Sequence, residues 1–292
     1  VGTPIVVKAD GLAAGKGVVL AQDLPSAERA VRDMLSGGRF GAAGKRVVIE
    51  EYLTGEEASF IAMVGDGQIL PMANSQDHKA RDDGDRGPNT GGMGAYSPAP
   101  VVTAEIHERI MSEVIRPTVD GLSAEGLPYT GFLYAGLMIA PDGTPKVLEY
   151  NCRFGDPETQ PILMRLKSDL VALCLAALDG RLDESNVEWD PRAALGVVMA
   201  AGGYPDGYEK GLPISGLDDA ARLPDCKVFH AGTKQVGGKT VTSGGRVLCA
   251  TALGASVRDA QRRAYSLVEK IDWRDAYFRR DIGHRAIARE RG

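Results

Sequence analysis

Short β-branched runs alternate with turn residues over the first quarter of the chain. This pattern predicts strands at residues 5–8, 17–20, 46–50, 57–64 and 68–72. A helix is expected at residues 26–35, where one face would carry the apolar residues Ala27, Ala30, Val31, Met34 and Leu35. It should end at Gly37-Gly38, because glycine commonly terminates helices.

The next segment is long and polar. Residues 74–98, NSQDHKARDDGDRGPNTGGMGAYSP, show no hydrophobic period. Loops of that length inside a compact domain tend to be functional lids or disordered segments, so we expect one of these here. After it, Thr103 should cap a helix that carries Ile106, Ile110 and Val114 on one face.

The remainder predicts further α+β structure. Strands at residues 132–140 and 146–151 should form a hairpin through a Pro-Asp-Gly turn, followed by a long helix at 159–178. An acidic stretch at 183–190 suggests a domain boundary. Beyond it we expect strands near 194–201, 227–231 and 246–251, and a helix from Ser256, which has capping-box spacing to Asp259.

Composition and charge narrow the function classes. A length of 292 residues suggests about two domains. The 37 glycines follow no three-residue repeat, which excludes collagen, and no apolar run is long enough to span a bilayer. A net charge of −5 argues against non-specific nucleic-acid binding. The four cysteines form no C-x-x-C pair, so we expect a reducing, cytoplasmic location.

Residues 8–17, KADGLAAGKG, form a glycine-rich loop between two expected strands. Its glycines would let backbone amides approach an anion, and Lys16 adds a cation. The loop is not a Walker A motif, because Asp10 stands where that motif needs glycine and Gly17 replaces the Ser/Thr. A tight hairpin with surface lysines is an equally good interpretation of this segment alone.

Two further segments suggest chemistry. Side chains alternate along a strand, so Glu149 and Asn151 should share one face as oxygen ligands for Mg²⁺, and Arg153 should continue that alternation. The alternative is an exposed polar strand end. Residues 47–57, VVIEEYLTGEE, could line an adenine pocket and offer a carboxylate to the ribose, or could be a solvated acidic turn.

Together these segments resemble the ATP-grasp ligases, and within them the phosphoribosylamine–glycine ligase family. The similar text comprises PIVVKADGLAAGKGVV, VVIEEYLTGEEASF, SQDHK, GPNTGGMGAYSPAP, YTGFLYAGLM and LEYNCRFGDPETQP. LGVVMAAGGYP, KVFHAGT and GGRVLCATALG resemble that family's carboxy-terminal domain, so nearly the whole chain is covered.

The resemblance implies an α/β (α+β) ATP-grasp fold, with two α+β subdomains that clamp ATP and a small carboxy-terminal α+β domain. The implied divisions are an incomplete nucleotide-binding subdomain at 1–68, a metal and substrate subdomain at 69–187, and the carboxy-terminal domain at 188–292. The family also has an amino-terminal domain before this region. We expect that this chain lacks that domain. In the longer enzyme, the amino-terminal domain should pack against the region that this chain represents.

The resemblance also implies roles for individual residues. The ATP contacts would be Lys8, Gly11, Gly15, Lys16, Gly17, Glu50, Glu51, Tyr52, Leu53 and Glu57. The ligands for Mg²⁺ or Mn²⁺ would be Glu149 and Asn151. The substrate contacts would be Asn74, Asp77, Asn89, Thr90, Gly91, Gly92 and Arg153. The catalytic residues would be Arg153 and Lys16.

The implied reaction belongs to purine biosynthesis and has two steps. The glycine carboxylate attacks the γ-phosphate of ATP, giving glycyl phosphate and ADP. The amine of 5-phosphoribosylamine then displaces phosphate, giving glycinamide ribonucleotide. We expect these small molecules as partners, with no nucleic acid or membrane, in a monomer or weak homodimer. The alternative is an ATP-binding fragment or module without ligase activity of its own.

Overall fold

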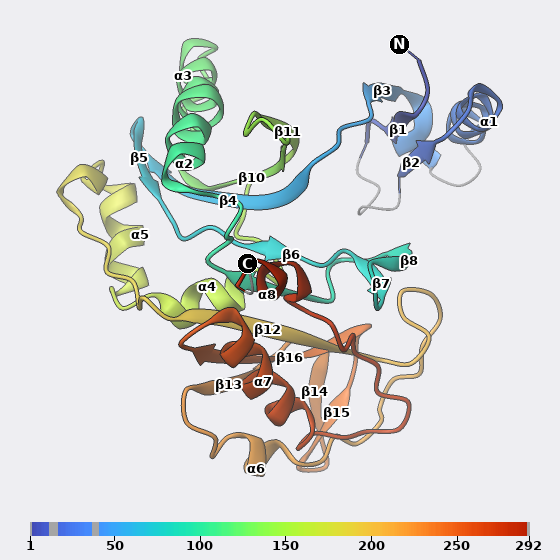
Figure 1. Cartoon of the computed structure of the whole chain (residues 1–292), viewed down its shortest axis with the longest axis vertical. Coiled ribbons are helices and arrows are strands. Elements are labelled where there is room, and N and C mark those ends of the chain that lie inside the picture. Colours follow the sequence, from blue (N-terminus) through green and yellow to red (C-terminus); the bar gives the residue numbers. More distant parts are fainter. Residues whose placement is uncertain (1, 12–16, 37–40, 291–292) are drawn as a thin grey trace. The chain divides into compact units, whose positions relative to one another are not determined.

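The computed structural model describes residues 2–11, 17–36 and 41–290 (Figure 1). The chain folds as two compact units, Val1–Thr54 and Gly55–Gly292, which are considered separately below. No helix among the described residues is both long and apolar enough to cross a membrane.

The first unit contains an antiparallel sheet with the strand order β2–β1–β3, made of β1 (Ile5–Ala9), β2 (Val18–Ala21) and β3 (Val47–Glu51). A 3₁₀ turn, η1 (Gly41–Lys45), precedes β3. Helix α1 (Leu24–Leu35) buries Ala27, Ala30 and Met34 in the core of this unit. The helix begins two residues earlier than expected because Asp23 caps it, accepting the Ser26 N–H at 2.7 Å. The expected Gly37-Gly38 end lies outside the described residues.

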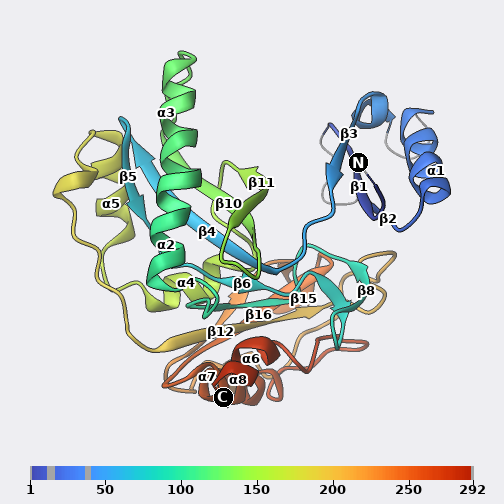
Figure 2. The ribbon, with the colours of Figure 1, turned by 45° about the horizontal axis from the view of Figure 1, so that its top comes forward.

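The second unit begins with an antiparallel sheet of order β11–β10–β4–β5, here called the first sheet. Its strands are β4 (Glu56–Gly65), β5 (Gln68–Pro71), β10 (Gly131–Ile139) and β11 (Pro145–Asn151). One face packs on the helical stretch α2 (Ala104–Ile110), η2 (Met111–Ile115) and α3 (Arg116–Ala124) (Figures 1 and 2). The expected cap is confirmed, since Thr103 Oγ1 accepts the Ile106 N–H at 3.3 Å.

The second sheet has the order β13–β16–β12–β9–β6 and is antiparallel throughout. Its strands are β6 (Gln76–Asp77), β9 (Gly94–Ser97), β12 (Ala193–Ala200), β13 (Cys226–His230) and β16 (Arg246–Gly254). Helix α7 (Val257–Val268) packs its apolar stripe into the core of this sheet, and Ser256 caps it as expected. The other elements are the hairpin β14 (Thr233–Val236) and β15 (Lys239–Thr242), and the short helices α6 (Leu217–Ala220) and α8 (His284–Arg289).

The expectation of a structureless loop at residues 74–98 is wrong. This segment contains β6, a small hairpin of β7 (Ala80–Asp82) and β8 (Arg86–Asn89), and β9. Strand β9 pairs with the apolar β12, so its sheet position comes from a partner more than ninety residues away, and no local period reveals it.

The single long helix expected at residues 159–178 is also wrong. It divides into α4 (Thr159–Arg165) and α5 (Leu170–Leu178), followed by the 3₁₀ turn η3 (Leu182–Glu184). The break has two causes, one from a distant residue and one local. The Lys167 N–H bonds to the Glu188 carbonyl at 2.9 Å, and the Asp169 carboxylate caps a new helix through the Val171 N–H at 2.8 Å.

Candidate functional site

The two expected metal ligands lie on one face of the first sheet. Antiparallel partners point to the same side, and Glu149 is opposite Gly136 while Asn151 is opposite Tyr134. The Asn151 Nδ2 atom lies 3.5 Å from Glu149 Oε1. A Cβ at residue 136 would stand 3.2 Å from the Cγ atom of Glu149, so the glycine leaves room for this carboxylate.

Strand β4 extends the same face. Ser59 is opposite Gly136 and Glu57 is opposite Met138, so both point to the side that carries Glu149. We call this side, with Glu57, Ser59, Tyr134, Glu149 and Asn151, the polar face of the first sheet. It collects side chains from three strands that are distant in sequence.

Next to this face, Lys79 forms ion pairs with two of the expected site residues, Asp77 and Glu57. Lys79 Nζ lies 3.1 Å from both carboxylate oxygens of Asp77 and 3.3 Å from Glu57 Oε2. Burial lowers the pKa of Lys79, but the two carboxylates outweigh it and hold the pKa well above its ordinary value. Lys79 is therefore a fixed positive charge at neutral pH.

A buried carboxyl group completes the cluster. Glu158 Oε1 accepts hydrogen bonds from Ser59 Oγ at 2.9 Å and from the Tyr134 hydroxyl at 3.0 Å. Burial raises the pKa of Glu158 above its ordinary value, and Asp77 raises it further. Burial also raises the pKa of Tyr134. The environment therefore favours the protonated, neutral forms of Glu158 and Tyr134, which lie beside the Lys79 cation.

The donor set on the polar face suits a hard divalent cation. The Glu149 carboxylate is exposed and Asn151 supplies an amide oxygen, and oxygen ligands of this kind bind Mg²⁺ while leaving positions for water or phosphate. No further acid is present on β10, GFLYAGLMI, which agrees with a small protein-derived ligand set.

A second group of potential ligands does not fit a metal ion. His78, Asp85 and His284 offer atoms within 4.8 Å of one another. However, His78 Nε2 accepts the Gly283 N–H at 2.9 Å, and the Asp85 carboxylate already binds Arg279 at 2.9 Å and Arg285 at 2.6 Å. The ligand atoms are engaged and two cations stand beside them, so this is an ion-pair network that ties the β7–β8 hairpin to the end of the chain.

The expected substrate segment, residues 89–92, is anchored to Lys79 by Thr90. The Thr90 N–H and the Thr90 Oγ1 each donate to the Lys79 carbonyl at 2.8 Å. The Asn89 side chain is exposed. Asn74 is engaged elsewhere, since its Oδ1 accepts the Ala99 N–H at 2.7 Å.

Arg153 lies outside strand β11, which ends at Asn151, so the expected alternation does not continue to it. Its guanidinium is exposed and Nη1 donates to the Phe154 carbonyl at 3.0 Å. The direction of the Arg153 side chain is therefore set by the bend after β11 and not by the alternation of a strand.

In the first unit, the sheet face away from α1 carries two of the expected nucleotide residues. Lys8 Nζ and Glu50 Oε2 are 2.5 Å apart, and their strand partners place them on the side of Val18, Leu20 and Val48, all of which are exposed. Figure 1 shows α1 on the other side of this sheet. An open apolar sheet surface beside a lysine suits a nucleotide base and phosphate.

The glycine-rich loop is described only in part. The Gly11 N–H donates to the Ala43 carbonyl at 3.0 Å, and a Cβ on Gly11 would stand 2.6 Å from the Ala43 Cα, so only glycine fits there. The Ala9 N–H bonds to the Gly17 carbonyl at 2.8 Å, which closes the loop between the antiparallel strands β1 and β2. Gly15 and Lys16 lie outside the described residues. Of the remaining expected residues, Glu51 and Tyr52 are exposed and Leu53 is half-buried.

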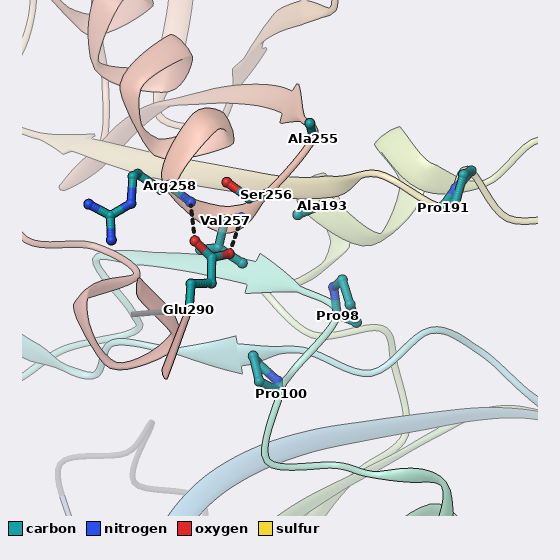
Figure 3. Close-up of a pocket in the computed structure, with 9 residues that line it drawn as sticks. All are labelled: Pro98, Pro100, Pro191, Ala193, Ala255, Ser256, Val257, Arg258 and Glu290. Carbon is teal, nitrogen blue, oxygen red and sulfur yellow. Dashed lines mark hydrogen bonds between the residues drawn. The ribbon is translucent and has the colours of Figure 1, made fainter. Parts of the chain in front are cut away.

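One pocket, of about 530 Å³, lies at the start of α7, and no expected site residue lines it. Figure 3 shows the Glu290 carboxylate at this helix end, where it accepts the N–H groups of Val257 at 2.7 Å and Arg258 at 3.3 Å. The Glu290 carboxylate therefore occupies the amino-terminal end of α7 and acts as a structural cap.

Sequence reasoning overlooked several residues near the expected site. Lys79 and Glu158 both stand in text that carried the family resemblance, SQDHK and LEYNCRFGDPETQP, but neither was assigned a role. Ser59 and Tyr134 occur in ordinary strand patterns. A signal was available only for Lys79, a lysine two residues from an acid in a polar segment, and that signal is weak.

Comparison with known proteins identifies the family. The phosphoribosylglycinamide synthetase ATP-grasp (A) domain family matches residues 1–159, and the C domain of the same family matches residues 194–285. Phosphoribosylamine–glycine ligase from Allochromatium vinosum is 74% identical over 291 residues, which cover 100% of this chain and 68% of that protein. The same enzyme from Pseudomonas aeruginosa is 67% identical, with 100% and 68% covered.

Solved structures are similar as well. The crystal structure of phosphoribosylamine–glycine ligase from Thermotoga maritima has a TM-score of 0.84 and 38% identity, covering 96% of this chain and 68% of that one. The biotin carboxylase domain of 2-oxoglutarate carboxylase from Hydrogenobacter thermophilus, at 16% identity and a TM-score of 0.69 over 95% of this chain and 59% of that one, shares the fold. The chain therefore has the ATP-grasp fold and belongs to the phosphoribosylglycinamide synthetase family.

Proposed function

We propose that the molecule ligates glycine to 5-phosphoribosylamine at the expense of ATP, releasing ADP, phosphate and glycinamide ribonucleotide in purine biosynthesis. One observation carries this proposal. The Glu149–Asn151 pair lies on the polar face that also carries Glu57, Ser59 and Tyr134. Lys79 and Asp77 contact this face through Glu57, and Glu158 contacts it through Ser59 and Tyr134, in a chain 74% identical to a phosphoribosylamine–glycine ligase. A nucleotide-binding module without ligase activity is not favoured, since these side chains are all present.

The chain's residues supply charge and position, as phosphoryl transfer requires. Glu149 and Asn151 hold a divalent cation, Mg²⁺ or Mn²⁺, which when bound neutralises phosphate charge. Arg153, at the exposed end of the same segment, binds the reacting phosphoryl or carboxylate group. Asp77, Asn74 and the segment 89–92 contact the substrates.

In the first unit, the nucleotide contacts are those suggested by the family. Lys8 and Lys16 bind the phosphates, and the loop glycines Gly11, Gly15 and Gly17 let the backbone approach them. Residues 50–53 line the adenine site. Glu57, which belongs to β4 of the second unit, binds the ribose. The open face with Val18, Leu20 and Val48 supports a nucleotide role for this unit.

We further propose a cytoplasmic location. The four cysteines, Cys152, Cys174, Cys226 and Cys249, are all free thiols in the structure, which suits a reducing compartment. We propose a monomer or a weak homodimer.

The test is ADP release by the natural polypeptide with Mg²⁺, glycine and 5-phosphoribosylamine. We expect release to require glycine and the amine together, with formation of glycinamide ribonucleotide. Stimulation by another carboxylic acid in place of glycine would contradict the substrate assignment. ATP binding without any turnover would instead support the binding module.

A further inference from the structure

Arg246, at the start of β16, lies where two separate turns of the chain meet. Its Nη1 atom donates to the Gly91 carbonyl at 2.6 Å and to the Asp156 carbonyl at 3.0 Å. Its Nη2 atom donates to the Asp156 carboxylate at 2.9 Å. One guanidinium thus joins the turn at residues 91–92 to the turn at residues 156–157.

Both turns are attached to expected site residues. Gly91 and Gly92 belong to the substrate segment, and Thr90 beside them donates twice to the carbonyl of Lys79. Asp156 follows Arg153 by three positions and precedes the buried Glu158 by two. Arg246 belongs to the region matched by the C domain of the family, whereas both turns belong to the region matched by the A domain.

The contact is close on every side. A Cβ on Gly91 would stand 2.9 Å from Arg246 Cζ, and a Cβ on Gly92, whose φ is +108°, would stand 2.4 Å from the Cδ atom of Pro157. The Gly91 N–H is also taken, by the Tyr204 hydroxyl at 3.1 Å. The backbone of the substrate segment is therefore pressed between β16 and the 156–157 turn, with both polar groups of Gly91 bonded.

We infer that Arg246 is a positioning residue of the ligase reaction, which aligns the substrate segment with the segment that carries Arg153. This inference rests on the proposed function. The guanidinium suits the role because its planar fork bonds a carbonyl and a carboxylate at once, which a lysine ammonium cannot do in the same geometry. The Arg246 side chain is 21% exposed, so most of it is held among these partners.

The experiment compares Arg246→Ala and Arg246→Lys with the wild-type natural polypeptide, and uses Arg222→Ala as the matched control. Arg222 is an exposed arginine of the same region, and it forms an ion pair with the nearby, exposed Asp219. We measure kcat and KM for each of the three substrates, the Tm, and amide hydrogen exchange at residues 90–93.

We expect Arg246→Ala to lower kcat/KM for 5-phosphoribosylamine by about 10- to 100-fold, because a small misplacement of binding groups is costly in rate. The KM for ATP should change by less than about two-fold, since the nucleotide contacts are elsewhere. Amides 90–93 should exchange faster, and Arg246→Lys should recover only part of the loss. Arg222→Ala should behave as wild type.

A second perturbation approaches the contact from the other side. Gly91→Ala places a Cβ against the guanidinium, so it should reproduce the loss of Arg246→Ala, and the double variant should be no worse than either single one. If Arg246→Ala fails to fold, Gly91→Ala alone tests the contact, with the same kinetic and exchange measurements.

Two results would overturn the inference. One is an equal loss of kcat/KM for all three substrates together with a lower Tm, which indicates a structural role alone. The other is unchanged kinetics with unchanged exchange at residues 90–93. If the wild type itself shows no glycine-dependent turnover, the proposed function fails, and the exchange measurement still decides whether Arg246 holds the segment.

Discussion

Arg279 is expected to be the costliest single charge to remove from the second unit. Its side chain is 0% exposed, and its guanidinium bonds Asp85 at 2.9 Å, Asp281 at 2.8 Å and the Ala80 carbonyl at 3.1 Å. These contacts attach the β7–β8 hairpin to the chain's last segment. The perturbation we consider is Arg279→Met, which keeps an unbranched apolar stem and removes the guanidinium with its charge.

The expected loss of stability depends on the carboxylates that remain buried without Arg279. Removing one partner of a buried ion pair costs about 3–5 kcal/mol, because the remaining charge is uncompensated. Asp85 keeps Arg285 at 2.6 Å and Asp281 keeps the Gly84 N–H at 2.8 Å, so the lower end, about 3 kcal/mol, is expected. For a unit of this size that corresponds to a Tm lowered by about 6–12 °C.

The assay is urea unfolding followed by tryptophan fluorescence. The two tryptophans of the chain, Trp189 and Trp273, both belong to the second unit, so the signal reports on that unit alone. The control is Arg274→Ala, whose ion pair with Glu209 is 61% and 62% exposed and should contribute at most about 1 kcal/mol. If Arg279→Met lowered the free energy of unfolding no more than this control does, burial of the ion pair would not explain its contribution to stability.

Three other outcomes are expected. Glu149→Gln should abolish Mg²⁺-dependent ADP release while the circular dichroism spectrum stays unchanged, and wild-type turnover in this variant would remove Glu149 from the metal site. Gly216→Ala should lower the free energy of unfolding by at least about 2 kcal/mol more than Gly237→Ala, because both have positive φ but only the Cβ at 216 meets a backbone oxygen, 1.7 Å away; equal urea midpoints would contradict this. Burial raises the pKa of Asp281, but Arg279 and the Gly84 N–H outweigh it and bring it to about 2, below the unfolded value of 3.8. The stabilisation is therefore present above about pH 4 and lost toward pH 2, and urea midpoints measured over that range should fall less steeply in Arg279→Met.

The strands with regular apolar patterns were predicted well from the sequence. Each strand expected at residues 5–8, 57–64, 132–140 and 146–151 is confirmed to within two residues at either end. Strands β1, β4 and β10 pack apolar side chains against helices of their own unit, so the local pattern and the tertiary environment agree. The same holds for α7, whose cap at Ser256 is a local interaction.

The failures occur where distant partners decide the structure. Residues 94–97 lie in a polar, glycine-rich stretch of sequence, yet they form β9 because the apolar β12 pairs with them. The helix expected at 159–178 breaks because residue 188 competes for the amide of Lys167. A pattern along one segment contains no information about such competitors.

The candidate site divides in the same way. The sequence alone placed Glu149 and Asn151 on one face of a strand, because side-chain alternation is a local property of a strand. Only the tertiary structure decided that Lys79, Glu57 and Glu158 gather beside them, and that Arg246 joins two turns more than sixty residues apart. The physical reason is that alternation and capping act over a few residues, whereas a buried charge takes its partners from whatever strands and turns the fold packs around it.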